Sequence, residues 1–220
     1  MLIVQSFVNS PVTSNCYVLF DKTISKDCII IDPGSRDEIE LFAFIESEDL
    51  IPKYIFLTHE HFDHCWGVNQ LVERYHIPIV CSSLCSKAIK DKKRNCSVFY
   101  DNVGFTIKHE TISVESIDNK LRFGETFILL YNTPGHTNAS ICMVADKFLF
   151  TGDLLIKEEK TITRLPTGSV ELLKESMAVI STLKGKGLTV YPGHGDGFSL
   201  DKYDLNKCLE GKANEEHSYI

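Results

Sequence analysis

The chain has 220 residues, a length that suits one sizeable domain or two small ones around a buried core. Hydrophobic residues make up 43% and charged residues 24%, shares typical of a globular protein that exclude a disordered or fibrous chain. The formal net charge of -7 argues against broad binding to a phosphate backbone, and no apolar run approaches the roughly 18 residues of a membrane span. We therefore expect no nucleic-acid partner and no membrane partner.

Strands and helices are predicted in both halves of the chain. Short runs rich in β-branched and aromatic residues predict strands at 2–8, 15–20, 28–34, 53–58, 77–81, 111–114, 121–123, 126–131, 140–144, 147–151 and from 188. Apolar residues at helical spacing predict helices at 36–47, 67–75, 83–90 and 170–183. Because tight turns join many neighbouring strands, we favour an α/β fold with two facing sheets and helices outside over one doubly wound sheet.

The cysteines indicate a reducing environment. Eight are present without any CxxC spacing, and several lie inside apolar runs, where a reduced cysteine packs as a small hydrophobic residue. The first twenty residues have no basic stretch and are interrupted by Pro11, so they are typical of strands rather than of a signal peptide. We therefore expect free thiols and a cytoplasmic location.

The segment 58–64, THEHFDH, is the strongest chemical signal in the sequence. It follows a predicted buried strand and precedes a predicted helix, so its polar side chains emerge at the edge of a sheet. Side chains two residues apart in an extended chain point the same way, so His59 and His61 can hold one ion. As the chain turns into the helix, Asp63 and His64 point elsewhere and can reach a second ion. Imidazole and carboxylate are the usual ligands of Zn²⁺ and related ions.

Three further segments each place one ligand-type residue beside a glycine at the end of a predicted strand: TPGHT with His136, TGD with Asp153 and YPGHG with His194. A lone histidine or aspartate in a loop more often has an ordinary structural role, and Asp63 also suits a helix cap. All seven residues nevertheless occur in the order that one binuclear site needs, so we predict two divalent metal ions. The remaining histidines are assigned to the surface or to ordinary packing: His76, His109 and His217.

Taken together, the motifs NCYVLF, CIIIDPG, THEHFDHCWG, TPGHT, TGDLL and YPGHGDG resemble those of the metallo-β-lactamase-fold hydrolases. The resemblance implies an αββα sandwich of two mixed sheets with the metals at one edge. It also implies a complete ligand set: His59, His61 and His136 for the first ion, Asp63, His64 and His194 for the second, and Asp153 bridging both. Asp63 is then the catalytic residue as well as a ligand, and the ions are zinc, with iron or manganese as alternatives.

Within this superfamily the sequence resembles the glyoxalase II-like branch, whose members hydrolyse the thioester of hydroxyacylglutathione. It departs from the branch pattern at Trp66-Gly67, where a Gly-Gly pair is usual, and only Arg164 corresponds to the Gly-Arg-x-Asp pattern that often follows TGDLL. Full-length glyoxalase II continues into a helical glutathione-binding domain, and residue 220 comes too soon after His194 to include one. We therefore expect a single domain over 1–220.

We expect a metal-dependent hydrolase that uses a metal-bridging hydroxide on a small-molecule acyl substrate, a thioester of the hydroxyacylglutathione type. A thiolate leaves without obligatory protonation because its parent thiol has a pKa of about 8.5, so the absence of an evident general acid suits a thioester better than an amide. The alternatives are a mononuclear iron persulfide dioxygenase and, less favoured, a nuclease or a lactonase of the same superfamily. Cys65 lacks an independent base and is assigned to packing, and the basic segment 87–94 to a solvated helix end.

Overall fold

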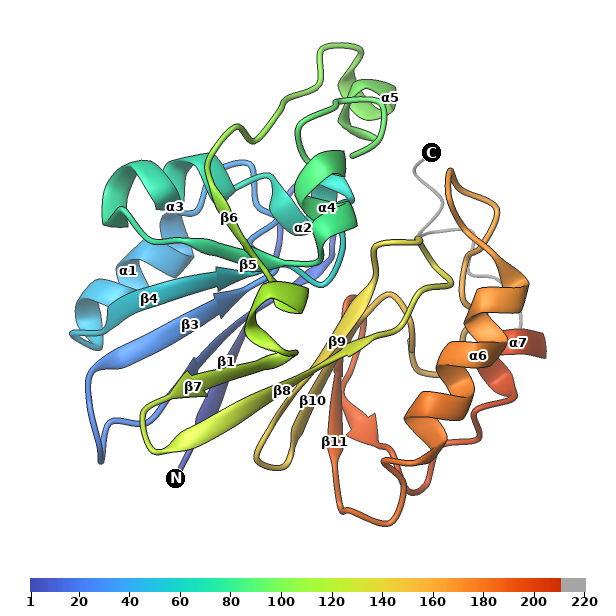
Figure 1. The fold of residues 1–220 in the computed structure, drawn as a ribbon. Helices are drawn as coiled ribbons and strands as arrows, with labels where there is room; N and C mark the ends of the chain where they lie inside the picture. The colour runs from blue at the N-terminus through green and yellow to red at the C-terminus, as the bar shows by residue number, and fades with distance from the viewer. Residues whose placement is uncertain (211–220) are drawn as a thin grey trace.

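Two six-stranded sheets form the centre of the protein, as the computed structural model shows for residues 1–210, with the side chains of residues 116 and 117 left aside. The strand order is β1-β2-β3-β4-β5-β6 in the first sheet and β12-β11-β10-β9-β8-β7 in the second. Each half of the chain thus builds one sheet, and the two sheets face each other (Figure 1).

The first sheet consists of β1 (Ile3–Val8), β2 (Asn15–Phe20), β3 (Asp27–Ile31), β4 (Ile51–Phe56), β5 (Ile79–Cys81) and β6 (Thr111–Ser113). The pairs β1–β2 and β2–β3 are antiparallel, and the pairs from β3 to β6 are parallel. Parallel strands are buried on both faces, which explains the continuous apolar run in β3. The carboxyl ends of β3, β4 and β5 therefore meet at one edge, where the THEHFDH segment follows β4.

The second sheet consists of β7 (Lys120–Phe123), β8 (Thr126–Asn132), β9 (Ile141–Ala145), β10 (Phe148–Gly152), β11 (Thr189–Pro192) and β12 (Phe198–Ser199). Its neighbouring strands are antiparallel except for β10 and β11, which run parallel. That parallel pair brings two glycine turns side by side, one after β10 and one after β11.

The longer helices are α1 (Ile39–Ser47), α3 (Val68–Tyr75), α4 (Ser83–Ala88) and α6 (Val170–Ser181). Short helical turns lie at α2 (Phe62–Cys65), α5 (Ser97–Asp101), η1 (Val114–Ile117) and α7 (Lys207–Glu210). Serine side chains cap two of the longer helices, because Ser82 accepts a hydrogen bond from the Cys85 amide and Ser169 accepts one from the Leu172 amide. No helix in residues 1–210 is long and apolar enough to cross a bilayer.

Successive isoleucines of β3 point to opposite faces of the first sheet and enter different apolar layers. Ile29 and Ile31 pack between the two sheets, whereas Ile30 packs beneath the helices. The layer between the sheets also contains Phe56, Ile128, Leu130, Met143 and Phe150. Leu41, Ile45 and Leu71 of α1 and α3 join the layer outside the first sheet, and Leu173, Met177 and Ile180 of α6 pack outside the second. Three apolar layers between four structural layers confirm the predicted αββα sandwich.

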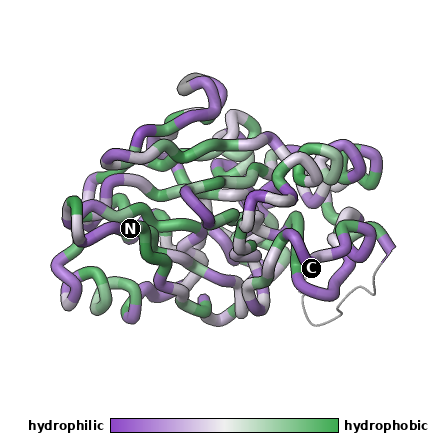
Figure 2. The backbone as a smooth tube through the Cα atoms, turned by 90° about the horizontal axis from the view of Figure 1, so that it is seen from below, coloured by the Kyte–Doolittle hydropathy of each residue, from purple (hydrophilic) through white to green (hydrophobic). Residues whose placement is uncertain are grey.

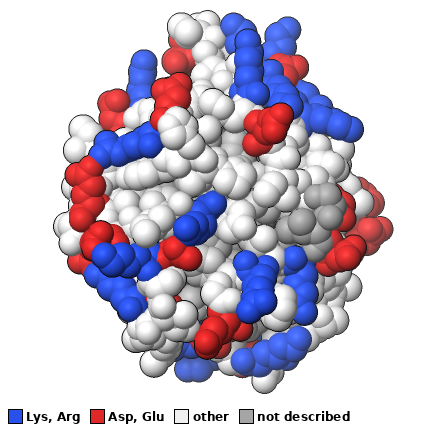
Figure 3. Space-filling model, turned by 60° about the vertical axis from the view of Figure 1, so that its left-hand side comes forward, with Lys and Arg blue, Asp and Glu red and all other residues white. Residues whose placement is uncertain are grey.

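Hydrophobic backbone segments run through the interior in Figure 2, as this layering requires. On the face shown in Figure 3, basic and acidic side chains are interspersed around a broad uncharged area. This mixture of signs agrees with the modest net charge of the whole chain.

Element boundaries differ from the sequence predictions mainly at short elements. The helix predicted from residue 36 begins at Ile39, and the helix from residue 67 is preceded by the separate turn α2. The sequence analysis did not predict α5, α7 and β12, which have five, four and two residues; one turn of helix or a two-residue strand shows no hydrophobic period.

Candidate metal centre

All seven predicted ligand residues lie together at one edge of the sandwich. They come from four loops: His59, His61, Asp63 and His64 follow β4, His136 lies between β8 and β9, Asp153 follows β10, and His194 follows β11. Because strands of both sheets end at this edge, Asp63 and His194, which are 131 positions apart in the chain, become neighbours. The structure thus brings together every residue that the sequence analysis placed in the site.

Three histidines form the first group of the centre. The ligand nitrogens of His59, His61 and His136 lie within 4.8 Å of one another, and all three residues are buried. Their ring centroids are 4.7 to 4.9 Å apart, and Nδ1 of His61 lies 3.0 Å from Nε2 of His136. This is the spacing of imidazoles that share one ion.

Asp63, His64 and His194 form the second group, again with ligand atoms within 4.8 Å of one another. Oδ2 of Asp63 lies 3.3 Å from Nε2 of His194 and 3.5 Å from Nε2 of His64. Asp153 contacts both groups, at 3.5 Å from Nε2 of His136, 3.3 Å from Nε2 of His64 and 3.6 Å from Nε2 of His194. A carboxylate in this position can bridge two ions.

An unpaired polar atom shows that the residues suit a bound cation. Nε2 of His59 is buried without a hydrogen-bond partner. A buried polar atom without a partner costs about 1–3 kcal/mol, and a divalent ion would remove that cost by accepting a nitrogen lone pair. Imidazoles and carboxylates are also the donor types that first-row divalent ions prefer.

The ring nitrogens that face away from the centre are held by acceptors. Nδ1 of His136 donates to the Ile162 carbonyl at 2.8 Å, and Nδ1 of His194 donates to the Thr13 carbonyl at 3.2 Å. Because a carbonyl only accepts, each Nδ1 carries a ring hydrogen, and Nε2 is the nitrogen directed into the site.

Asp32 and Thr58 support both groups, and the sequence analysis missed this role. Asp32 accepts hydrogen bonds from the Thr58 amide at 2.8 Å, from Thr58 Oγ1 at 2.6 Å and from Nδ1 of His64 at 3.1 Å. Since the Thr58 hydroxyl hydrogen goes to Asp32, its oxygen accepts from Nδ1 of His59 at 3.1 Å. The sequence analysis included Asp32 only as part of the strand predicted at 28–34, whereas β3 ends at Ile31. The signal that could have found it is a carboxylate at the end of a buried apolar strand.

Two glycines are required by close approaches at the site. Gly152 has a φ of +49°, and a Cβ there would lie 2.3 Å from Oγ1 of Thr58. At Gly193 a Cβ would lie 2.0 Å from Oδ1 of Asp153. Both turns therefore bring the backbone so close to the side chains of Thr58 and Asp153 that a residue with a Cβ would clash.

The two groups differ in their electrostatics. Burial, together with the neighbouring histidines, lowers the pKa of His61 to about 3 and lowers the pKa of His59 well below its usual value. Burial also lowers the pKa of His136. These imidazoles are therefore neutral, the form that binds metals.

In the second group the carboxylates reverse this effect. Burial lowers the pKa of His194, but the charges of Asp153 and Asp63 outweigh it and raise the value to about 10. The pKa of His64 is raised for the same reason. Burial raises the pKa of Asp63, yet the two histidines lower it to about 2. Without a metal this half of the centre is a network of ion pairs.

Residues beside the ligands serve in packing. Sγ of Cys65 donates to the Glu60 carbonyl at 3.4 Å, and burial raises the pKa of this thiol, which makes it a poor nucleophile. Trp66 stacks on Phe105 with centroids 5.6 Å apart and meets Phe62 edge-on at 5.5 Å, so its ring packs in an aromatic cluster.

The other residues singled out from the sequence lie outside the site. Arg164 and His76 are exposed and His109 is half-buried, whereas His217 lies outside the described residues. Lys87 occupies the last turn of α4, and the rest of the basic segment follows that helix end, as predicted.

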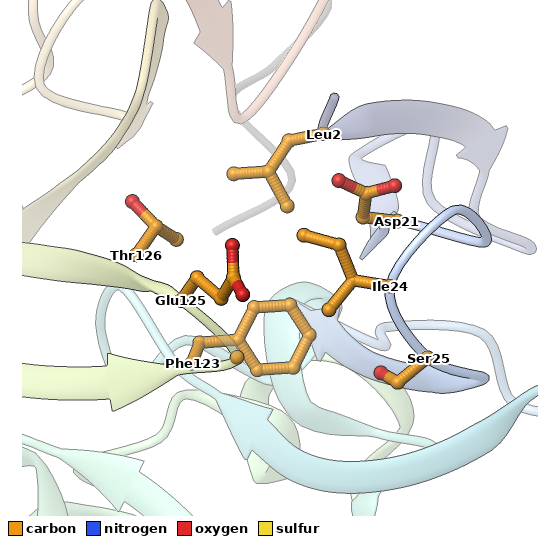
Figure 4. Close-up of a pocket in the computed structure, with 8 residues that line it drawn as sticks. Leu2, Asp21, Ile24, Ser25, Phe123, Glu125 and Thr126 are labelled. Carbon is orange, nitrogen blue, oxygen red and sulfur yellow. The ribbon is translucent and has the colours of Figure 1, made fainter.

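A separate cavity of about 150 Å³ opens at the far end of the sheets, beside the turns that precede β3 and β8 (Figure 4). Its apolar wall is formed by Leu2, Ile24 and Phe123, whose side chains point toward one another in this view, with Asp21 and Glu125 at the side. None of the eight residues that line it is a histidine or a cysteine, so it does not extend the metal centre.

Comparison with known proteins agrees with this geometry. A sequence profile of the metallo-beta-lactamase superfamily matches residues 9–194. The chain therefore belongs to that superfamily. It is 30% identical over 205 residues to the probable metallo-hydrolase YqgX of Bacillus subtilis, covering 91% of this chain and 94% of the relative. It is also 30% identical over 183 residues to the hydroxyacylglutathione hydrolase of Buchnera aphidicola subsp. Baizongia pistaciae, where the match covers 80% of this chain but 64% of the relative.

Solved structures show the same fold. The BLEG-1 B3 metallo-beta-lactamase superimposes with a TM-score of 0.82 at 26% identity, covering 90% of this chain and 94% of that protein. TTHA1623, solved in a di-iron-bound form, gives a TM-score of 0.73 at 25% identity, with coverage of 94% and 98%. Superfamily, fold and a histidine–aspartate cluster together identify a candidate metalloenzyme of the metallo-hydrolase type.

Proposed function

We propose that the protein is a hydrolase that holds two divalent metal ions, zinc in the first instance, and acts on a small-molecule thioester. The observation that carries this proposal is the position of Asp153, whose carboxylate contacts His136 of the first group and both His64 and His194 of the second. In this arrangement His59, His61 and His136 would hold one ion, Asp63, His64 and His194 would hold the other, and Asp153 would be shared between them.

When bound, two such ions would polarise a carbonyl and would lower the pKa of water toward neutrality. The protein supplies the rest of the chemistry through position and charge. The carboxylate of Asp63 is ionised at neutral pH because its pKa is about 2, so it can bind an ion and orient a water molecule by accepting a hydrogen bond. Asp63 is for this reason the residue we propose as catalytic.

A thioester fits this centre better than an amide. The neighbouring thiol, Cys65, is buried with a raised pKa and offers no nucleophile. We assign no side chain to donate a proton to the leaving group, and a thiolate leaves without one. The likeness to a hydroxyacylglutathione hydrolase supports the same substrate class.

A substrate panel tests the proposal. Zinc-, iron- and manganese-loaded protein is assayed with acyl-glutathione and acyl-CoA thioesters, a lactone, a phosphodiester and glutathione persulfide. We expect thioester hydrolysis by the zinc form, its loss on chelation, and retained turnover in Cys65→Ala, which serves as the control for a thiol nucleophile.

Two results contradict the proposal. If the loaded protein leaves every thioester intact while cleaving another ester class, the substrate assignment is wrong. If only the iron form is active and it consumes oxygen with glutathione persulfide, the protein is an oxidoreductase.

A further inference from the structure

A buried polar bridge joins the two loops that carry the first group of histidines. Glu60 lies between His59 and His61 and points away from the metal centre, as expected where side chains alternate. Its Oε2 accepts a hydrogen bond of 2.9 Å from Oγ1 of Thr137, the residue that follows His136. Glu60 and Thr137 are 1% and 0% exposed, so water does not replace this bond.

The hydrogen bonds around Thr137 have a defined direction. Its hydroxyl has one hydrogen, which goes to Glu60, and its oxygen accepts from the Ala139 amide at 3.2 Å. Oγ of Ser140 lies 3.1 Å from the same oxygen and accepts from the Thr137 amide at 3.2 Å. The loop that follows His136 is thus wound around the Thr137 hydroxyl, and Glu60 anchors that hydroxyl to the other loop.

A second tie lies on the far side of His59, where the Ile141 amide donates to the Thr58 carbonyl at 2.9 Å. Two ties at different positions fix both the distance between the loops and their relative rotation. Removing the Glu60 bond leaves His136 restrained by its own hydrogen bond to Ile162 and by the Ile141–Thr58 backbone bond, and neither of these reaches the chain between His59 and His61.

We propose that Glu60 is a positioning residue, which acts through Thr137 to hold His136 at the distance from His59 and His61 that one ion requires. This inference rests on the proposed metal-binding role of the three histidines. Supporting residues behind metal ligands typically affect metal affinity or activity by about 10-fold to 100-fold, and we expect an effect in the lower part of this range.

Four variants isolate the bridge. Glu60→Ala removes the acceptor. Thr137→Val removes the donor with little change in shape, and it also removes the oxygen that accepts from the Ala139 amide. Glu60→Gln and Thr137→Ser keep an acceptor and a hydroxyl. Thr133→Val is the matched control, because Thr133 lies in the same loop, is buried, and directs its hydroxyl to Sγ of Cys142 at 3.2 Å rather than to Glu60.

The measured quantity is the affinity of the metal-free protein for the first Zn²⁺, obtained by competition with a chelator and without any substrate. We expect Glu60→Ala and Thr137→Val each to weaken it about 10-fold, and the double variant to be no weaker than either. Glu60→Gln, Thr137→Ser and Thr133→Val are expected to stay within about twofold of the original protein.

The proposal is wrong if Glu60→Ala and Thr137→Val lose thermal stability but bind zinc as Thr133→Val does. Additive losses in the double variant also contradict it. If Glu60→Ala does not fold, Thr137→Val and Thr137→Ser decide between these outcomes. A failure of the proposed hydrolase function can be told apart from a failure of the Glu60 proposal, because the zinc affinities are measured without substrate turnover.

Discussion

Both groups of the metal centre contain buried histidines, but these histidines are in opposite electrostatic states. In the first, three buried imidazoles lie together without a carboxylate of their own, and their pKa values are lowered. In the second, Asp63 and Asp153 hold His64 and His194 in ion pairs and raise their pKa values. A metal can bind the first group without displacing protons, whereas the second must release them. Burial prepares one half of the centre for a cation, and charge pairing keeps the other half folded until one arrives.

Asp153 is the residue on which this division depends most, so its loss should have the largest effect. We expect Asp153→Asn to lower metal-dependent turnover by about 100-fold or more, since it removes a ligand rather than a supporting residue. It should also destabilise the metal-free protein by about 3–5 kcal/mol, because two histidines lose a buried partner. Metal analysis, kinetics and denaturant unfolding measure these effects.

Asp146→Asn, on the exposed turn between β9 and β10, is the matched control for that substitution and should change neither quantity. Retention of two ions and of turnover by Asp153→Asn would show that the two groups are not joined through this carboxylate.

Variants that remove one ligand from one group should lower turnover by about 10-fold to 100-fold, which is less than Asp153→Asn does. They should also show which group holds which ion. Asp63→Ala should leave one ion bound at the three histidines, with the fold intact. His136→Ala should instead weaken binding of the ion that we assign to the three histidines. Metal stoichiometry and circular dichroism distinguish the two. If both variants lose both ions equally, the centre is a single unit and the division is wrong.

The smallest effect concerns the stability of the metal-free protein as pH changes. The pKa of His61 is about 3 in the folded state against about 6.5 when unfolded, so stability falls as pH drops from 6.5 toward 3. The pKa of His194 is about 10 in the folded state, so its contribution is complete below pH 6.5 and is lost as pH rises toward 10. The urea midpoint should therefore peak near pH 6.5.

His194→Asn should flatten the alkaline side of that profile and leave the acid side in place. A profile of the metal-free protein that rises steadily from pH 6.5 to 10 would contradict the ion-pair description of the second group.

The ligand positions could be predicted from the sequence because each follows a recognisable strand and sits beside a glycine or within one short segment. Strands of a sandwich end at shared edges, so adjacent motifs in the fold need not be adjacent in the chain. Asp32 could not be predicted this way, because Asp-Pro-Gly serves equally as a turn and only the hydrogen bonds to Thr58 and His64 reveal its role. The Glu60 bridge depends on a contact between residues 77 positions apart, which spacing within one segment cannot show.

The cysteines lie in different apolar layers, and all eight are buried as free thiols. Cys28 and Cys85 lie beneath the helices of the first sheet, whereas Cys142 and Cys208 lie beneath α6. A thiol in such a layer reacts with an alkylating reagent only while that layer is open. The native cysteines therefore report separately on the two sides of the sandwich. The rate at which each cysteine-containing peptide is alkylated, measured by mass spectrometry, shows how often that side opens in the folded protein.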